Sequence, residues 1–293
     1  MTSTIAFLGL GIMGSPMSVN LTAAGHTVVG YDVHTAAAEP LRAAGGRVAD
    51  SIADAVSGAD VVITMLPDSP QVEEVVLGEN GVLDNAKPGV LVIDMSTIRP
   101  ETSKRVAEVG RCRNLRVLDA PVSGGQQGAI DGVLSIMVGG DAADFEAARP
   151  VFEPLGKTIV HVGPHGAGQT VKAANQLVVG GTYALVAEAI VLLEAAGVDA
   201  AGGLDVLAGG LAGSRILELK RRSMVAREFA PGFRIDLHHK DMGIVLAAAR
   251  EAEVSLPMGA LVAQLIAAAR AQGHGGLDHS ALLKVAESLS GKD

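Results

Sequence analysis

The stretch Ile5-Ala6-Phe7-Leu8-Gly9-Leu10-Gly11-Ile12-Met13-Gly14 joins a short apolar run to three glycines spaced Gly-x-Gly-x-x-Gly. The apolar run is typical of a buried parallel strand. Apolar residues at helical spacing follow it, and Gly25 stands where that predicted helix closes. The next predicted strand ends in Asp32, 18 positions after Gly14. The chain therefore opens with a strand, a glycine turn, a helix and a second strand that ends in an acid.

Each part of this pattern has a physical role in binding a dinucleotide. Gly9 permits the tight turn, Gly11 lets the backbone approach a pyrophosphate, and Gly14 lets the helix pack on the strand. The helix start offers N–H groups and a positive dipole end to phosphates, and the acid suits the adenosine ribose hydroxyls. A structural glycine turn is the alternative. The cofactor-binding residues predicted from this unit are Gly9, Gly11, Ile12, Met13, Gly14 and Asp32.

The residues around Asp32 bear on which nicotinamide cofactor binds. A 2′-phosphate would be repelled by a carboxylate and would need an arginine nearby. Val33, His34 and Thr35 follow Asp32, and no arginine occurs before Arg42. The sequence favours NAD over NADP.

Composition places limits on the class of protein. The 293 residues suit two domains, and 48% hydrophobic with 19% charged residues describe a globular chain with a large core. The net charge of −9 argues against a nucleic-acid partner. Cys112 is the only cysteine, which fits a reducing compartment. No signal peptide is apparent, and the apolar run 177–198 is interrupted by glutamates, so we expect a cytoplasmic protein with no membrane association.

Strand and helix patterns alternate through the first half of the chain. Further strands are predicted at 60–66, 90–94, 116–120 and 160–163. This alternation indicates a Rossmann-type, doubly wound and mostly parallel α/β sheet. Ligands bind beyond the carboxyl ends of such strands. Three polar or glycine-rich segments follow these ends: Leu66-Pro67, Ser96-Thr97 and Ser123-Gly124-Gly125.

The sequence pattern predicts that the second half of the chain is helical. A long apolar helix is expected from about 167 to 196, and five more are predicted at 203–208, 215–226, 240–253, 257–272 and 280–289. We therefore expect a Rossmann domain at residues 1–163 and an all-α domain at 164–293. The long helix opens the second domain, and its apolar sides suggest burial between domains or subunits.

Two segments could carry chemistry. Lys172, Asn175 and Gln176 share one face of the long helix, and a lysine is costly to bury there without a task or partner. The alternative is a lysine that reaches solvent beside two surface amides. Ser123-Gly124-Gly125 combines a hydroxyl with two residues that have no Cβ, so backbone N–H groups can converge on a carboxylate. The alternative is a plain turn after a strand.

A third segment, residues 231–241, contains the pair His238-His239. Adjacent residues of a helix point apart, and no nearby carboxylate or cysteine has ligand spacing. We therefore expect no metal site, and a loop with a helix start is the simpler interpretation.

Four motifs in a fixed order give a resemblance that no single one would give. The chain resembles the β-hydroxyacid dehydrogenase family (the 3-hydroxyisobutyrate dehydrogenase group) over nearly its whole length. Its motifs are residues 9–14, residues 119–125, residues 166–176 with their lysine, and Lys240-Asp241. Other stretches are similar to the subgroup that reduces tartronate semialdehyde (2-hydroxy-3-oxopropanoate) to D-glycerate: residues 64–70, 77–81, 209–214 and 231–238.

The resemblance implies roles for individual residues. Lys172 matches the catalytic lysine, which acts as general acid and base, and Asn175 matches an amide that positions the substrate. Ser123, Gly124 and Gly125 match the site for the substrate carboxylate. Thr97 and Lys240 match positions that contact the cofactor. Leu66 and Pro67 follow the end of a predicted strand, where the cofactor is expected to bind.

The same helix separates this chain from similar enzymes. In 6-phosphogluconate dehydrogenases a histidine and an asparagine follow the lysine at the positions of Asn175 and Gln176, so decarboxylation is not expected. Imine-reducing relatives usually lack the lysine. Three alternatives stay open: 3-hydroxyisobutyrate dehydrogenase, another short β-hydroxyacid or semialdehyde oxidoreductase, and a cofactor-binding regulator without turnover. The apolar helices favour a homodimer or homotetramer.

Overall fold

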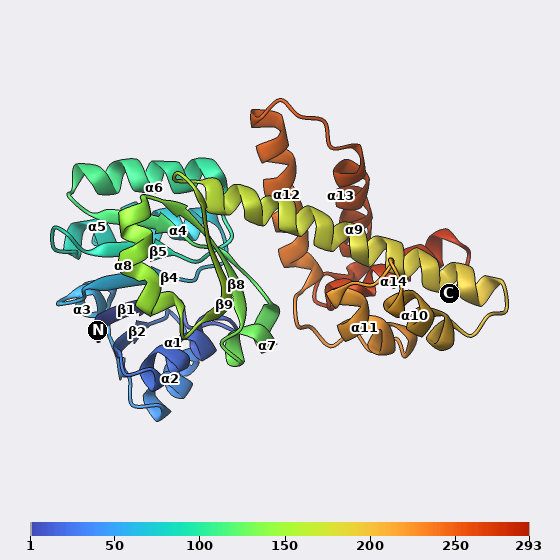
Figure 1. The fold of residues 1–293 in the computed structure, drawn as a ribbon, viewed down its shortest axis with the longest axis horizontal. Helices are drawn as coiled ribbons and strands as arrows, with labels where there is room; N and C mark the ends of the chain where they lie inside the picture. Colours follow the sequence, from blue (N-terminus) through green and yellow to red (C-terminus); the bar gives the residue numbers. More distant parts are fainter. Residues whose placement is uncertain (1, 293) are drawn as a thin grey trace. The chain divides into compact units, whose positions relative to one another are not determined.

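The computed structural model describes residues 2–292 and shows two compact units (Figure 1). The first unit runs to Lys172 and the second begins at Ala173. Helix α9 (Ala167–Ala195) passes from one unit into the other. The domain boundary expected between residues 163 and 164 stays a prediction.

The first unit is built on a single sheet of nine strands. They are β1 (Thr4–Leu8), β2 (Thr27–Tyr31), β3 (Arg47–Val48), β4 (Val61–Thr64), β5 (Leu91–Asp94), β6 (Arg116–Asp119), β7 (Val122–Ser123), β8 (Leu134–Gly140) and β9 (Gly156–Gly163). The parallel part has the order β3-β2-β1-β4-β5-β6, which is the Rossmann order. Strand β8 runs antiparallel to β6 and β7, and β9 pairs parallel with β8.

Helices cover both faces of this sheet because alternate residues of each strand point to opposite faces. On one face, Phe7 and Ile93 pack with residues of α1, α2 and α8. On the other, Leu8 and Val92 pack with residues of α3, α4, α5 and α6. Their bounds are α1 (Gly14–Ala23), α2 (Glu39–Ala43), α3 (Ile52–Val56), α4 (Ser69–Leu77), α5 (Val82–Asn85), α6 (Pro100–Cys112), α7 (Gly125–Ile130) and α8 (Ala142–Phe152). The predicted α/β class is confirmed.

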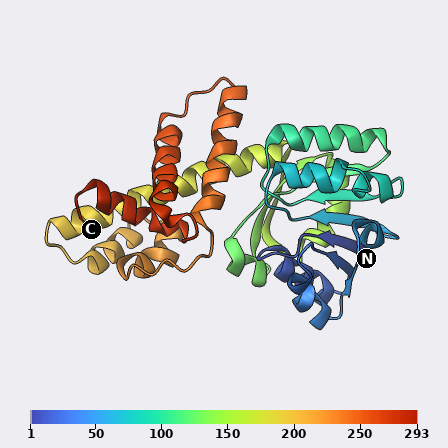
Figure 2. The same cartoon turned by 180° about the vertical axis from the view of Figure 1, so that it is seen from behind.

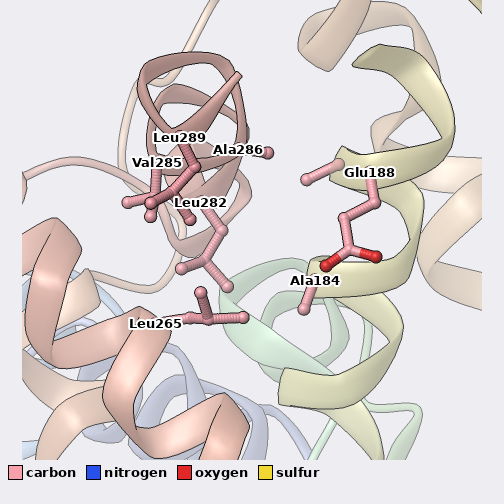
Figure 3. Close-up of a pocket in the computed structure, with 8 residues that line it drawn as sticks. Ala184, Glu188, Leu265, Leu282, Val285, Ala286 and Leu289 are labelled. Atoms are coloured by element: carbon pink, nitrogen blue, oxygen red, sulfur yellow. The ribbon is translucent and has the colours of Figure 1, made fainter. Parts of the chain in front are cut away.

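The second unit is helical, as predicted (Figure 2). It consists of the rest of α9 with α10 (Ala200–Gly209), α11 (Arg215–Val225), α12 (Ile235–Glu251), α13 (Pro257–Ala269) and α14 (Leu282–Leu289). Its core joins Ile190 of α9, Leu217 of α11, Val245 of α12 and Ile266 of α13. A small pocket between α9, α13 and α14 is lined by apolar side chains and Glu188, and none of the candidate site residues reaches it (Figure 3).

The structure differs from the sequence-based expectation in several strands and in where some elements begin: β9 begins at Gly156, four residues before the predicted strand, and α10 begins at Ala200, three residues before the predicted helix. Strands β3, β7 and β8 were not predicted, because two of them have only two residues and β8 mixes Ser135, Met137 and two glycines into its apolar pattern. β8 runs antiparallel to β6 and β7, and the rest of the sheet is parallel, in agreement with the predicted mostly parallel sheet. Helix α12 begins at Ile235, five residues before the predicted start, with Asp236 in its first turn.

Helix α9 is the one helix in the described part of the chain that is long and apolar enough to cross a membrane by length and composition alone. Core helices of soluble proteins meet the same criterion. In α9, 44% of the most apolar window is buried inside the protein.

Candidate functional site

The glycine turn after β1 has the geometry that dinucleotide binding requires. Gly9 adopts a positive φ of +96°, and a Cβ there would collide with the carbonyl of Met65. A Cβ on Gly14 would collide with the carbonyl of Gly9, so both glycines are needed for the turn to close. Gly11 differs, because no atom lies within 4 Å of its would-be Cβ. The turn thus leaves open space where backbone approach to a pyrophosphate is expected. Ile12 lies exposed in the same turn, and Met13 is the cap residue of α1.

Asp32 is held beside this turn by two backbone N–H groups. Its Oδ2 accepts from Leu10 N at 2.7 Å, and its Oδ1 accepts from His34 N at 2.8 Å. An ionised carboxylate has about four acceptor sites, so capacity for ribose hydroxyls remains. Arg42, the first arginine after Asp32, is paired with Glu39 at 2.7 Å.

The loops after β4 and β5 are joined by a buried hydrogen-bond network. Asp94 Oδ1 accepts from Thr64 Oγ1 at 2.7 Å and from Ser96 N at 3.2 Å. Ser96 Oγ in turn accepts from Leu66 N at 2.9 Å. The network fixes the two loops that carry three of the predicted cofactor contacts: Leu66, Pro67 and Thr97.

The acid at the centre of this network predicts a dependence of stability on pH. Burial raises the pKa of Asp94 to about 6, against hydrogen bonds from Ser96 and Thr64 that lower it. An acid with a raised folded-state pKa contributes stability below its unfolded pKa and loses it as pH rises through the folded value. We expect the difference in unfolding free energy between wild type and Asp94→Asn to fall by about 2–3 kcal/mol between pH 4 and pH 7. Urea unfolding at a series of pH values measures it, and a constant difference would contradict the assignment.

The first turn of α9 is tied to the ends of β5 and β6. Asp119 accepts from Gly166 N at 2.7 Å and from Gln169 N at 3.0 Å, and burial raises the pKa of this carboxyl. The side chain of Gln169 accepts from Ile98 N at 3.1 Å and donates to the Ser96 carbonyl at 2.8 Å. A Cβ on Gly168 would collide with the carbonyl of Met137. The glycine-rich entry therefore lets the helix approach the sheet closely enough for these bonds to form.

This anchoring places Lys172 against the backbone of β7. The lysine is 7% exposed, and its Nζ donates to the Val122 carbonyl at 2.7 Å. The alternative of a solvent-reaching lysine is therefore wrong. Next to Val122 are Ser123, half-buried, and the glycine pair: Gly124 has a φ of +143° and Gly125 one of +64°, conformations that side-chain-bearing residues rarely adopt. The first unit thus brings the lysine and the Ser-Gly-Gly segment together.

In the second unit, α9 and α12 share a polar network. Asn175 is half-buried, and its Nδ2 donates to Gln176 Oε1 at 2.8 Å. Gln176 Nε2 donates to Asp241 Oδ2 at 2.6 Å, and Asp241 Oδ1 forms an ion pair with Lys240 Nζ at 2.8 Å. Two predicted site residues, Asn175 and Lys240, are therefore the ends of one chain of contacts.

Sequence reasoning did not single out the residues that support the site. Asp94 and Asp119 each end a parallel strand, and a buried acid at that position was the signal that could have found them. Gln169 gave no such signal, because its two partners lie more than 70 residues away in the sequence. Among residues 2–292, no cluster of three or more His, Cys, Asp or Glu side chains could hold a metal ion.

The Rossmann strand order, the glycine turn and Asp32 define a dinucleotide-binding protein of the dehydrogenase class. Residues 4–163 match the family model of the NAD binding domain of 6-phosphogluconate dehydrogenase. Residues 166–286 match that of the NAD-binding domain of NADP-dependent 3-hydroxyisobutyrate dehydrogenase.

Full-length relatives agree with both models. The chain is 43% identical to 2-hydroxy-3-oxopropionate reductase of Escherichia coli (strain K12), with 98% of each chain covered. It is 42% identical to 3-hydroxyisobutyrate dehydrogenase of Pseudomonas aeruginosa, with 99% of each covered. The solved structure of Mycobacterium tuberculosis 3-hydroxyisobutyrate dehydrogenase with L-serine superposes with a TM-score of 0.88 at 39% identity, covering 97% of this chain and 99% of that one. The chain belongs to the β-hydroxyacid dehydrogenase family of NAD(P)-dependent oxidoreductases that act on CH–OH groups.

Proposed function

We propose that this enzyme reversibly reduces 2-hydroxy-3-oxopropanoate to D-glycerate with NADH, using Lys172 as general acid and base. The observation that carries the proposal is the buried amine of Lys172 on the backbone of Val122, directly before Ser123-Gly124-Gly125. A cation beside an anion-binding turn suits a short substrate that carries both a carboxylate and a carbonyl.

The residues present fit a nicotinamide dinucleotide. The turn from Gly9 to Gly14 would hold the pyrophosphate, with Ile12 and Met13 at its surface, and Asp32 would hold the adenosine ribose. Further contacts are assigned to Leu66, Pro67, Thr97 and Lys240. When bound, the nicotinamide supplies or accepts the hydride.

The substrate carboxylate is assigned to the segment after Val122. The hydroxyl of Ser123 and the N–H groups of Gly124 and Gly125 are the donors, and the missing Cβ atoms leave room for an anion to approach.

Lys172 acts on the reacting oxygen. An ammonium has three N–H donors, and the Val122 carbonyl accepts one of them, which orients the group. In reduction, Nζ stabilises the negative charge that develops on the aldehyde oxygen and gives it a proton. In oxidation, the neutral amine removes the proton of the alcohol.

The choice of substrate rests on similarity to the subgroup that reduces tartronate semialdehyde. The stretches 64–70, 77–81, 209–214 and 231–238 support it, as does the E. coli relative. Methylmalonate semialdehyde differs from this substrate by a methyl group in place of the 2-hydroxyl, and the 42% identity to a 3-hydroxyisobutyrate dehydrogenase makes that activity the second candidate.

Initial rates of cofactor oxidation test this proposal. The panel consists of 2-hydroxy-3-oxopropanoate (tartronate semialdehyde), methylmalonate semialdehyde, succinate semialdehyde and glyoxylate. We expect kcat/KM to be highest for 2-hydroxy-3-oxopropanoate. NADH should exceed NADPH by about tenfold or more, because a 2′-phosphate would lie against the Asp32 carboxylate. A higher kcat/KM with methylmalonate semialdehyde would favour the second candidate. An absence of oxidation with every substrate and both cofactors would overturn the proposal.

We also propose a cytoplasmic homodimer or homotetramer. Val178, Leu185 and Leu192 recur every seven residues on α9 and are 65%, 61% and 70% exposed in the single chain. An exposed apolar row of this kind is typical of a subunit interface. The single cysteine, Cys112, suits a reducing compartment.

A further inference from the structure

The network of the second unit fixes which way two amides face. A side-chain amide presents a donor nitrogen on one side and an acceptor oxygen on the other. Gln176 is 4% exposed and Asp241 2%, so each contact between them is sheltered from water. The orientation of each amide is therefore determined by the group it meets.

The orientation begins at Asp241. Its ion pair with Lys240 identifies it as a carboxylate, which can only accept hydrogen bonds. Gln176 must therefore turn its Nε2 to Asp241, and its Oε1 is left facing Asn175. Because Oε1 can only accept, Asn175 must turn its Nδ2 to Gln176. The carbonyl oxygen Oδ1 of Asn175 is then directed away from Gln176.

We propose that Gln176 and Asp241 are positioning residues that make Asn175 present its Oδ1 as the acceptor for the 2-hydroxyl of the substrate. This inference rests on the proposed function. A carboxylate has no proton to donate, so it is not the partner of that oxygen. In the proposed function, Lys172 binds the reacting oxygen, and Ser123-Gly124-Gly125 binds the carboxylate. The 2-hydroxyl is the one remaining polar group of 2-hydroxy-3-oxopropanoate.

The proposal has a consequence for substrate choice. An acceptor that the bound substrate shields from water is left unsatisfied when its hydroxyl partner is missing, which discriminates more strongly than a change of apolar contact. The relay from Lys240 through Asp241 and Gln176 to Asn175 thus selects acids with a hydroxyl at C2 over acids with hydrogen or methyl there.

Gln176→Met tests the relay, since methionine matches the shape of glutamine without its hydrogen bonds. We expect kcat/KM for 2-hydroxy-3-oxopropanoate to fall about 10- to 100-fold, mostly through KM. For 3-oxopropanoate, which lacks only the 2-hydroxyl, we expect a change within about threefold. The control is Gln272→Met, at an exposed position of the same unit, which should alter neither substrate.

Equal losses on both substrates, or no loss on either, would overturn the relay while leaving the proposed function intact. A wild-type enzyme that reduces neither substrate would instead overturn the proposed function.

A second experiment tests the orientation without any substrate. Asn175→Asp places a carboxylate against Gln176 Oε1, so we expect a lower melting temperature. When Asp241→Asn is added, the Gln176 amide can rotate by half a turn. Its Nε2 then donates to the carboxylate at position 175, and its Oε1 accepts from the carboxamide at position 241. The double variant should therefore be more stable than the sum of the two single effects predicts, which a double-mutant cycle measures. Strictly additive shifts would contradict the orientation and with it the relay.

Discussion

Lys172→Met should lower kcat for 2-hydroxy-3-oxopropanoate by about 1,000-fold or more while leaving NADH binding unchanged. In the proposed mechanism, the lysine donates a proton to the reacting oxygen and stabilises the negative charge that develops there. General acid catalysis contributes about 10²–10⁴ and a charge-stabilising donor about 10²–10³, with overlap when one group does both. Methionine fills most of the space of the buried lysine side chain and has no amine. Steady-state rates and NADH fluorescence titration measure the two quantities.

The matched control is Lys87→Met, at an exposed position of the same unit, which should keep wild-type rates. A folded Lys172→Met protein with near-normal turnover would remove Lys172 from the mechanism. A loss of NADH binding in that variant would assign the lysine to the cofactor instead.

Asp119→Leu should destabilise the first unit by about 2–5 kcal/mol and also lower kcat. Leucine leaves the N–H groups of Gly166 and Gln169 without their acceptor, and each buried donor so orphaned costs about 1–3 kcal/mol. The first turn of α9 then loses its hold on the end of β6. Because Lys172 lies one turn further along, a small displacement of the helix moves its amine. Urea unfolding and kcat measure the two effects.

Asp119→Asn offers a graded comparison. Its oxygen can accept from one of the two N–H groups, but its NH₂ faces the other donor, so we expect an intermediate loss. Asp141→Leu, at an exposed acid before α8, is the control and should leave kcat unchanged. If Asp119→Leu matched wild type in both stability and kcat, the anchoring role would be wrong.

Local sequence patterns predicted most of the architecture. The turn at residues 9–14 and the strand ending near Asp32 predicted a Rossmann-type domain, because glycine spacing and strand length depend on neighbours in sequence. The start of α9, expected at about residue 167, is observed at Ala167. Gly163 and Gly166, the glycines of that entry, adopt φ values of +148° and +86° just before it. What was missed was short or mixed: β3, β7 and β8 gain their stability from pairing partners that a local window does not contain.

In the candidate site, too, the residues themselves could be predicted from local sequence, but their contacts could not. Residue type and spacing pointed to Lys172, Asn175 and the Ser-Gly-Gly segment. They could not show that the lysine amine meets the Val122 carbonyl, 50 residues away in sequence. Nor could they show that Asp241 determines the orientation of Asn175 through Gln176. Both depend on which elements pack together, and only the folded chain brings them into contact.

Chemical rescue of Lys172→Ala is the most direct test that the amine itself carries the reaction. The variant leaves space where the lysine side chain stood, and a small primary amine can enter it and supply the missing cation. We predict that the rate of NADH oxidation with 2-hydroxy-3-oxopropanoate rises with the concentration of propylamine, and that propanol at the same concentrations gives no increase. A rate that is already near wild type without amine, or that propanol raises as much as propylamine does, would contradict the account.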